Sequence, residues 1–209
     1  MLLYAITSCR LLPGSEAEKR SGLVALARAW ARGGVDYIQI REKDLPVLEL
    51  LALARQIVAA VRKEGRETRV LVNGPAEIAR EASADGVHLP GSAPPGAGDK
   101  ARRGYRRAGR EAIVSRACHS VEEVWAARDA SLIVFAPVFE KVDSPQGTGV
   151  VAAGQGLEVL SEACRAAGSV PVIALGGVTP QNAADCVAAG AAGVAGIRLF
   201  LGEEWRGLR

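Results

Sequence analysis

Aromatic residues, paired cysteines and long apolar runs are scarce in this 209-residue sequence, and each scarcity excludes a class of protein. Only 4% of the residues are aromatic although 49% are hydrophobic, so we expect a core of Ala, Val, Leu and Ile. The four cysteines are far apart and form no CxxC pair, which argues against a zinc site. No apolar run approaches the roughly 18 residues of a membrane helix, and no basic leader precedes the first strand-like run. We therefore expect a cytoplasmic protein without a membrane partner.

The net charge of the chain is also small. The formal net charge is +3 at pH 7, and the basic residues are scattered apart from one arginine-rich stretch. A nucleic-acid site would need more basic residues on one face together with stacking aromatics, so no nucleic-acid partner is expected and small acidic ligands are favoured. The arginine-rich stretch is interpreted as the solvated face of a helix, and its members are Arg102, Arg103, Arg106, Arg107 and Arg110.

Short runs rich in Val, Ile and Leu alternate with longer stretches rich in Ala, Leu and Arg. This alternation is typical of repeated β-α units around a parallel sheet, and the chain is long enough for one complete barrel. The sequence therefore predicts an α/β fold with a single (β/α)8 TIM-barrel domain over residues 1–209. The eight expected strands are Leu2–Thr7, Tyr37–Glu42, Arg69–Asn73, Gly86–Pro90, Ile113–Cys118, Leu132–Val138, Val170–Leu175 and Gly193–Ile197.

The stretches between these strands contain helix signals. Asp44 is expected to cap the second helix, with Pro46 in its first turn. Only residues 198–209 follow the last strand, so a short terminal helix is expected there. The stretch Asp143–Gly156 is rich in glycine, and long β-α loops lie at the active face of a barrel. The expected helices include Ala17–Ala31, Pro46–Lys63 and Val121–Arg128.

Glycines and an alanine stand at the ends of the seventh and eighth expected strands. Gly176 and Gly177 follow the seventh, and Ala195 and Gly196 lie in the eighth. Small residues at these places let backbone N–H groups approach an anion, and the N-termini of short helices add a favourable dipole. The pattern indicates a phosphate-binding site. The alternative is that Gly176 and Gly177 only permit a tight strand-to-helix turn.

A row of polar residues ends the second expected strand. Alternation along a strand places Gln39, Arg41 and Lys43 on one face. Two cations and an amide that point the same way would suit a diphosphate. The alternative is a salt-bridged strand end in which Glu42 and Asp44 are the partners of the cations.

Asn73 ends the third expected strand, and His88 lies in the fourth. Both could provide hydrogen-bonding groups at the barrel mouth. An isolated histidine on an apolar strand is more often a satisfied core residue than a catalyst. His119, which follows the fifth strand, lies near a helix N-cap that Ser120 and Glu123 are expected to form.

These segments together resemble the superfamily of thiamin phosphate synthases and TenI-type thiazole tautomerases. The resemblance runs from Tyr4-Ala5-Ile6-Thr7 to the last strand. For the synthases it implies an enzyme, expected as a homodimer, that joins hydroxymethylpyrimidine diphosphate to thiazole phosphate with magnesium and releases diphosphate. It assigns the pyrimidine diphosphate to Gln39, Arg41, Lys43 and Asn73. It assigns the thiazole phosphate to Gly176, Gly177, Ala195 and Gly196.

The sequence departs from the synthase pattern at the magnesium ligands. A synthase has an Asp directly after the Asn and another soon after the fourth strand, where Gly74 and the stretch Gly91-Ser92-Ala93-Pro94 stand here. Mg²⁺ needs oxygen ligands such as carboxylates. We therefore assign no metal ligand, and Mg²⁺ stays a candidate cofactor whose usual ligands are missing. Ser144 stands near the position of a basic residue of the family, for which Lys141 could substitute.

Other features are shared with the tautomerases. The segment Gly147-Thr148-Gly149-Val150 matches a pattern of that branch, which adds Gly149 to the candidate substrate-binding residues. That branch typically has a histidine for proton transfer at the end of the sixth strand, where this chain has Pro137. Since Pro137 cannot carry a proton, His88 or Cys118 would have to replace it.

Three functions follow from this mixed pattern. The first is a synthase-type transferase, in which Arg41 and Lys43 are the catalytic residues that stabilise the leaving diphosphate. The second is a thiazole-phosphate tautomerase. The third is a non-catalytic barrel that binds thiazole phosphate or thiamin phosphate.

Overall fold

The computed structural model describes residues 1–65, 67–142 and 150–208. The chain divides into two compact units, which are described separately below. The first unit contains Tyr4–Leu89 and Ala93–Val114. The second contains Met1–Leu3, Pro90–Ser92 and Ser115–Arg209.

Eight parallel strands form a closed barrel in the order β1-β10-β9-β6-β5-β4-β3-β2. This confirms the predicted (β/α)8 class, and each observed strand lies within the range expected for it. A separate antiparallel pair, β7 (Lys141–Val142) and β8 (Val150–Ala152), was not predicted. The barrel strands are β1 (Leu2–Ile6), β2 (Tyr37–Ile40), β3 (Arg69–Val72), β4 (Gly86–Leu89), β5 (Ile113–Cys118), β6 (Leu132–Phe135), β9 (Val172–Ala174) and β10 (Gly193–Gly196).

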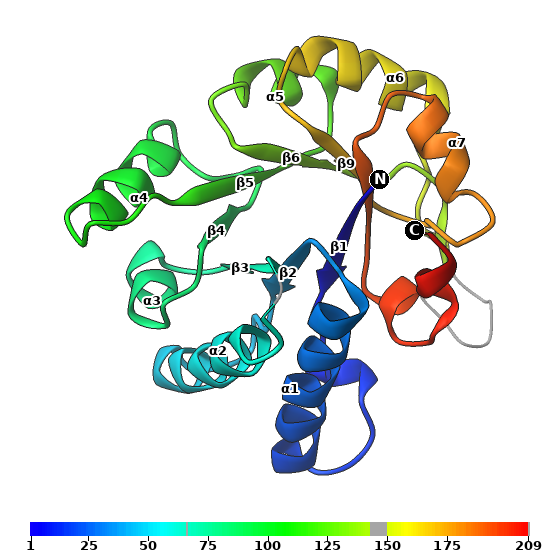
Figure 1. The fold of residues 1–209 in the computed structure, drawn as a ribbon. Coiled ribbons are helices and arrows are strands. Elements are labelled where there is room, and N and C mark those ends of the chain that lie inside the picture. Colours follow the sequence, from blue (N-terminus) through cyan, green and yellow to red (C-terminus); the bar gives the residue numbers. More distant parts are fainter. Residues whose placement is uncertain (66, 143–149, 209) are drawn as a thin grey trace. The chain divides into compact units, whose positions relative to one another are not determined.

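Helices alternate with the barrel strands along the chain (Figure 1). The short terminal helix expected after the last strand is a pair of 3-10 helices, η2 (Arg198–Phe200) and η3 (Glu204–Leu208). Within the described ranges, no helix is long and apolar enough to span a membrane. The remaining helices are η1 (Cys9–Leu11), α1 (Glu16–Gly33), α2 (Val47–Arg62), α3 (Ala76–Glu81), α4 (Ala97–Arg106), α5 (Val121–Ala126), α6 (Gly156–Ala167) and α7 (Ala183–Ala188).

In the first unit, α1 begins and ends at well-defined caps. The Ser15 side chain accepts a hydrogen bond from the Glu18 N–H, and the Glu18 side chain accepts one from the Ser15 N–H. This capping box satisfies donors that the first helical turn leaves free. Gly34 ends the helix in the left-handed conformation, as is common at helix C-termini. Figure 1 shows α1 beside α2, with which it packs closely.

The start of α2 differs from the prediction. Pro46 is the N-cap, and no side chain caps the start of the helix with a hydrogen bond. Asp44 instead pairs with Arg10 at 2.7 Å, so its proposed role as a cap was wrong. The helix is nevertheless well anchored, because its buried residues recur at the spacing of a helix face. They are Leu50, Leu51, Leu53, Ala54, Ile57, Val58 and Val61.

In the second unit, β9 lies between β6 and β10. Ile133 pairs with Val172, and Ile173 pairs with Gly193. Helix α5 packs beside α6, as Figure 1 shows. The Phe200 and Trp205 rings pack with their centroids 5.7 Å apart, so aromatic burial stabilises the short terminal helices.

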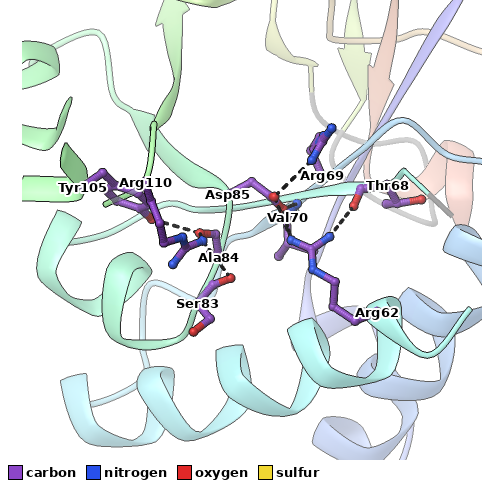
Figure 2. A network of polar contacts seen from close by, with 9 residues as sticks. All are labelled: Arg62, Thr68, Arg69, Val70, Ser83, Ala84, Asp85, Tyr105 and Arg110. Atoms are coloured by element: carbon purple, nitrogen blue, oxygen red, sulfur yellow. Dashed lines mark hydrogen bonds and ion pairs between the residues drawn. The ribbon is translucent and has the colours of Figure 1, made fainter. Parts of the chain in front are cut away.

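A polar network joins α2 and β3 to the residue that precedes β4 (Figure 2). Arg62 Nη2 donates to both carboxylate oxygens of Asp85 at 2.7 Å, and the Val70 N–H donates to Oδ2 at 2.7 Å. Arg62 Nη1 also donates to the Thr68 carbonyl, and Arg69 lies 3.6 Å from Asp85. The Asp85 side chain is only 11% exposed. Its carboxylate therefore links the start of β3 to the start of β4 through largely buried hydrogen bonds.

We expect Asp85→Asn to lower the free energy of unfolding by roughly 1–3 kcal/mol, because it removes the charged acceptor that Arg62 and the Val70 N–H share. Urea unfolding measures the loss. Glu16→Gln is the matched control, because the Glu16–Lys19 pair lies at the surface, where ion pairs contribute little to stability. Equal losses in the two variants would contradict a structural role for this network.

Candidate active site

A buried polar cluster lies in the first unit, formed by residues of β1, β2 and β4. Gln39 is 1% exposed, and the Tyr4 hydroxyl donates to its Oε1 at 3.1 Å. The same hydroxyl lies 3.5 Å from His88 Nδ1. The structure thus brings together two predicted site residues, Gln39 and His88. Tyr4 was missed, because an aromatic residue in a strand gives no signal that its hydroxyl orients an amide.

Burial changes the chemistry of His88, which is 5% exposed. Desolvation, and secondarily the charge of Arg41, lower the pKa of His88 from its ordinary 6.5 to about 4. The ring is therefore neutral at pH 7 and can accept or donate a hydrogen bond without carrying charge. A histidine with such a low pKa is poorly suited to proton transfer at neutral pH.

The depressed pKa predicts a loss of stability in acid. Between pH 6.5 and 4 the unfolded chain binds a proton at His88 that the folded chain does not, so stability falls as the pH drops through this window. The loss reaches up to about 1.4 kcal/mol per pH unit. Urea unfolding of wild type and His88→Gln at pH 7, 6 and 5 should give a smaller loss for the variant.

The control for this experiment is His119→Gln, because His119 is exposed. That variant measures the effect of removing an exposed imidazole. If His88→Gln showed the same dependence of stability on pH as the wild type, the interpretation of His88 as a neutral buried ring would be wrong.

Arg41 and Lys43 directly follow β2. Arg41 is partly exposed and Lys43 is exposed, and neither forms an ion pair with another residue of the described part of the chain. Glu42 is 8% exposed and accepts hydrogen bonds from the Thr7 hydroxyl and the Cys9 N–H instead. Glu42 and Asp44 are therefore not the ion-pair partners of Arg41 and Lys43, and the alternative of a salt-bridged strand end was wrong. Both cations are available to an anion.

Asn73 lies close to these cations in the fold. Its N–H donates to the Ile40 carbonyl at 2.9 Å, at the point where β2 and β3 end side by side. Asn73 and Arg41 thus directly follow two neighbouring strand ends. Lys43 lies in a turn three residues beyond β2, so the expected alternation of Gln39, Arg41 and Lys43 on one strand face does not extend to it.

We expect Arg41→Ala to weaken the binding of inorganic diphosphate by roughly 10- to 100-fold, because a charge-assisted contact is lost. Calorimetric titration measures the affinity. Lys63→Ala removes the same charge at the far end of α2, where Lys63 is exposed, and should bind as the wild type does. Unchanged affinity in Arg41→Ala would remove Arg41 from the site.

In the second unit, Gly176 and Gly177 form a tight turn after β9. Both have positive φ angles, 98° and 63°, which side chains disfavour. A Cβ atom would lie 2.8 Å from Pro137 Cα at Gly176, and 2.7 Å from the Glu140 carbonyl oxygen at Gly177. The packing of this turn against the chain after β6 thus requires both glycines, as the structural alternative predicted.

The same turn also leaves donors for an anion. The N–H groups of Gly177 and Val178 donate no hydrogen bond within residues 1–65, 67–142 and 150–208. Asn182 holds the turn from both sides, since its Oδ1 accepts from the Thr179 N–H at 2.8 Å and its Nδ2 donates to the Gly177 carbonyl at 3.1 Å. Successive free N–H groups in a rigid turn suit a phosphate. Asn182 was missed, although its position three residues after Thr179 is a recognisable turn signal.

Two other predicted phosphate-binding residues, Ala195 and Gly196, lie in the same unit. Ala195 and Gly196 are buried in β10, and a Cβ atom at Gly196 would lie 2.7 Å from Leu199 Cβ. Gly149 and Ser144 lie outside the described residues. An open cavity of about 420 Å³ is lined in part by Phe139 and Glu140. These two residues also pack against Gly177, which places the cavity beside the glycine turn.

Two groups that could transfer protons, Cys118 and His119, lie at the end of β5. Burial raises the pKa of the Cys118 thiol to about 11, and the nearby Glu123 carboxylate adds to this shift. His119 Nδ1 lies 2.8 Å from the Ala136 carbonyl oxygen, and the backbone N–H of His119 donates to the Glu123 carboxylate. Ser120 caps α5, as predicted, through a hydrogen bond from the Glu123 N–H. Neither candidate replacement for the tautomerase histidine, His88 or Cys118, has a pKa near neutrality.

The usual magnesium ligands of the family are missing from this chain, as expected from the sequence. Within the described residues, no group of three or more His, Cys, Asp or Glu side chains is placed to hold a metal. At Gly74 a side chain would meet Leu50 rather than a polar group. Asp99, one of the carboxylates that could replace a missing ligand, pairs with Arg102 instead, and Asp143 lies outside the described residues.

The closed parallel barrel places the chain among the (β/α)8 proteins, and comparison with known proteins narrows this class. The model of the thiamine monophosphate synthase family matches residues 3–200. The thiamine-phosphate synthase of Methanoculleus marisnigri is 38% identical over 189 residues, which is 85% of this chain and 80% of that protein. The thiamine-phosphate synthase of Corynebacterium jeikeium is 32% identical over 208 residues, or 94% and 88% of the two chains.

A solved structure agrees with these sequence matches. The thiamine phosphate pyrophosphorylase from Pyrococcus furiosus superposes with a TM-score of 0.76 at 26% identity, covering 99% of this chain and 90% of that one. The chain therefore belongs to the thiamine monophosphate synthase family. This confirms the family that the sequence resembles.

Proposed function

We propose that this protein joins hydroxymethylpyrimidine diphosphate to thiazole phosphate and releases thiamin phosphate and diphosphate. Arg41 and Lys43 bind the diphosphate, with Gln39, Asn73 and the neutral His88 as hydrogen-bonding groups beside them. The turn at Gly176 and Gly177, with Ala195 and Gly196 of β10, binds the thiazole phosphate. The observation that carries the proposal is the pair of cations after β2, which have no ion-pair partner in the described chain.

The reaction breaks one bond and forms one. The bond between the pyrimidine methylene carbon and the diphosphate oxygen breaks, and the diphosphate leaves with the electron pair. The lone pair of the thiazole nitrogen then forms the new carbon–nitrogen bond, which leaves the positive charge on the ring. Charge develops mainly on the departing diphosphate, so electrostatic stabilisation by Arg41 and Lys43 is the contribution that the protein must make.

The absence of a proton transfer from this scheme fits the described residues. Pro137 has no titratable group, while the pKa of His88 is lowered to about 4 and that of Cys118 is raised to about 11. Neither His88 nor Cys118 is therefore suited to the proton transfer that a tautomerase needs at neutral pH.

No step is assigned to magnesium, which stays a candidate cofactor, because no carboxylate stands at Gly74 or in Gly91-Ser92-Ala93-Pro94, where the resemblance expects its ligands. Positive charge for the diphosphate comes from the two side chains after β2. Guanidinium and ammonium groups are both established phosphate ligands in proteins.

Turnover tests the proposal directly. Purified protein is incubated with thiazole phosphate and hydroxymethylpyrimidine diphosphate, with Mg²⁺ or with a chelator, and thiamin phosphate is followed. We expect product that requires both substrates and is lowered at least about tenfold by Arg41→Ala, the loss expected for one charged contact.

The other functions predict different results from the same sample. Turnover of thiazole phosphate without the pyrimidine partner would identify a tautomerase. Tight binding of thiazole phosphate or thiamin phosphate without any turnover would identify a binding protein. Either result would overturn the transferase.

A further inference from the structure

The Thr7 hydroxyl lies in a buried chain of hydrogen bonds that reaches Arg41. The Arg41 N–H donates to Thr7 Oγ1 at 2.9 Å, and this hydroxyl donates to Glu42 Oε1 at 2.6 Å. The second carboxylate oxygen, Oε2, accepts from the Cys9 N–H at 3.0 Å. Two successive residues after β2 are thus fixed to the residues that follow β1.

The roles of donor and acceptor in this chain are determined. A threonine hydroxyl has one proton, and a carboxylate can only accept it, so the Thr7 proton points to Glu42 and its lone pairs remain for the Arg41 N–H. Thr7 is 0% exposed and Glu42 is 8% exposed, which limits competition from water. Hydrogen bonds to a charged acceptor are short and strong.

The sheet itself does not require this hydroxyl. Strands β1 and β2 are already joined by their backbone ladder, and the Thr7 N–H donates to the Gln39 carbonyl at 2.9 Å. The hydroxyl instead fixes the first residue beyond the ladder, where β2 has ended. That residue is Arg41, whose guanidinium needs a defined direction to bind an anion through two N–H groups.

We propose that Thr7 and Glu42 are positioning residues for diphosphate binding, which hold the backbone of Arg41 in the orientation that its side chain needs. This inference rests on the proposed function, in which Arg41 binds the diphosphate. Glu42 acts through Thr7 and the backbone, and neither residue touches the diphosphate.

Thr7→Val and Thr7→Ser separate this role from simple packing. Valine keeps the shape of threonine and removes the hydroxyl, whereas serine keeps the hydroxyl. Calorimetric titration with inorganic diphosphate should give an affinity at least about tenfold weaker for Thr7→Val and within about threefold of wild type for Thr7→Ser. Affinity for thiazole phosphate should stay within about twofold in both variants. This measurement is the control for folding, because a general loss of folded protein would weaken the binding of both ligands.

Hydrogen exchange of the full chain provides a second readout. The Arg41 amide should exchange at least about tenfold faster in Thr7→Val, since its acceptor is gone. The Thr7 amide, which bonds to the Gln39 carbonyl, should keep its protection. If Thr7→Val does not fold, Glu42→Gln removes the charged acceptor with little change of shape and should weaken diphosphate affinity in the same way.

The outcomes distinguish the two proposals. Wild-type affinity for diphosphate in the folded Thr7→Val variant, or in Glu42→Gln when Thr7→Val does not fold, would overturn the positioning role and leave the proposed function standing. A wild-type protein that does not bind diphosphate would overturn the proposed diphosphate site itself, and this inference with it.

Discussion

The backbone hydrogen bonds between parallel strands are the constraint on which the rest of this structure depends. Neighbouring parallel strands end at the same edge of a sheet, so residues that follow them are brought together whatever their distance in sequence. Asn73 and Arg41 meet in this way, because β2 and β3 pair in register from Tyr37 with Arg69. At the opposite ends of the strands, Asp85 accepts hydrogen bonds from the Val70 N–H and from Arg62, so this end contributes to stability and not to the candidate site.

Burial divides the polar residues of the candidate site into two kinds. Gln39 and His88 are almost completely buried, and the low pKa of His88 follows from that burial. Arg41 and Lys43 lie just beyond the strand and keep contact with solvent. Neutral hydrogen-bonding groups inside and cations at the edge are an economical arrangement for an anionic ligand, since a buried cation without a partner would be strongly destabilised.

Strand positions could be predicted from the sequence because each strand is a short run of Val, Ile and Leu bounded by turn residues. The candidate cations and the glycine turn could be named for the same reason, since they directly follow predicted strands. The role of Asp44 could not be predicted. An acidic residue before Pro46 suggests a helix cap, and the sequence does not show that Asp44 forms an ion pair with the distant Arg10. The assignment of the site residues to individual ligands remains a prediction.

The sequence by itself determined the class of this protein, because periodic hydrophobicity and the order of the motifs are local properties of the chain. Only the tertiary structure decided which polar groups face each other. Tyr4 orients Gln39, Thr7 links Glu42 to the backbone of Arg41, and burial keeps His88 neutral. These contacts join residues more than thirty positions apart, and hydrogen-bond direction and desolvation depend on that spatial arrangement rather than on any local pattern.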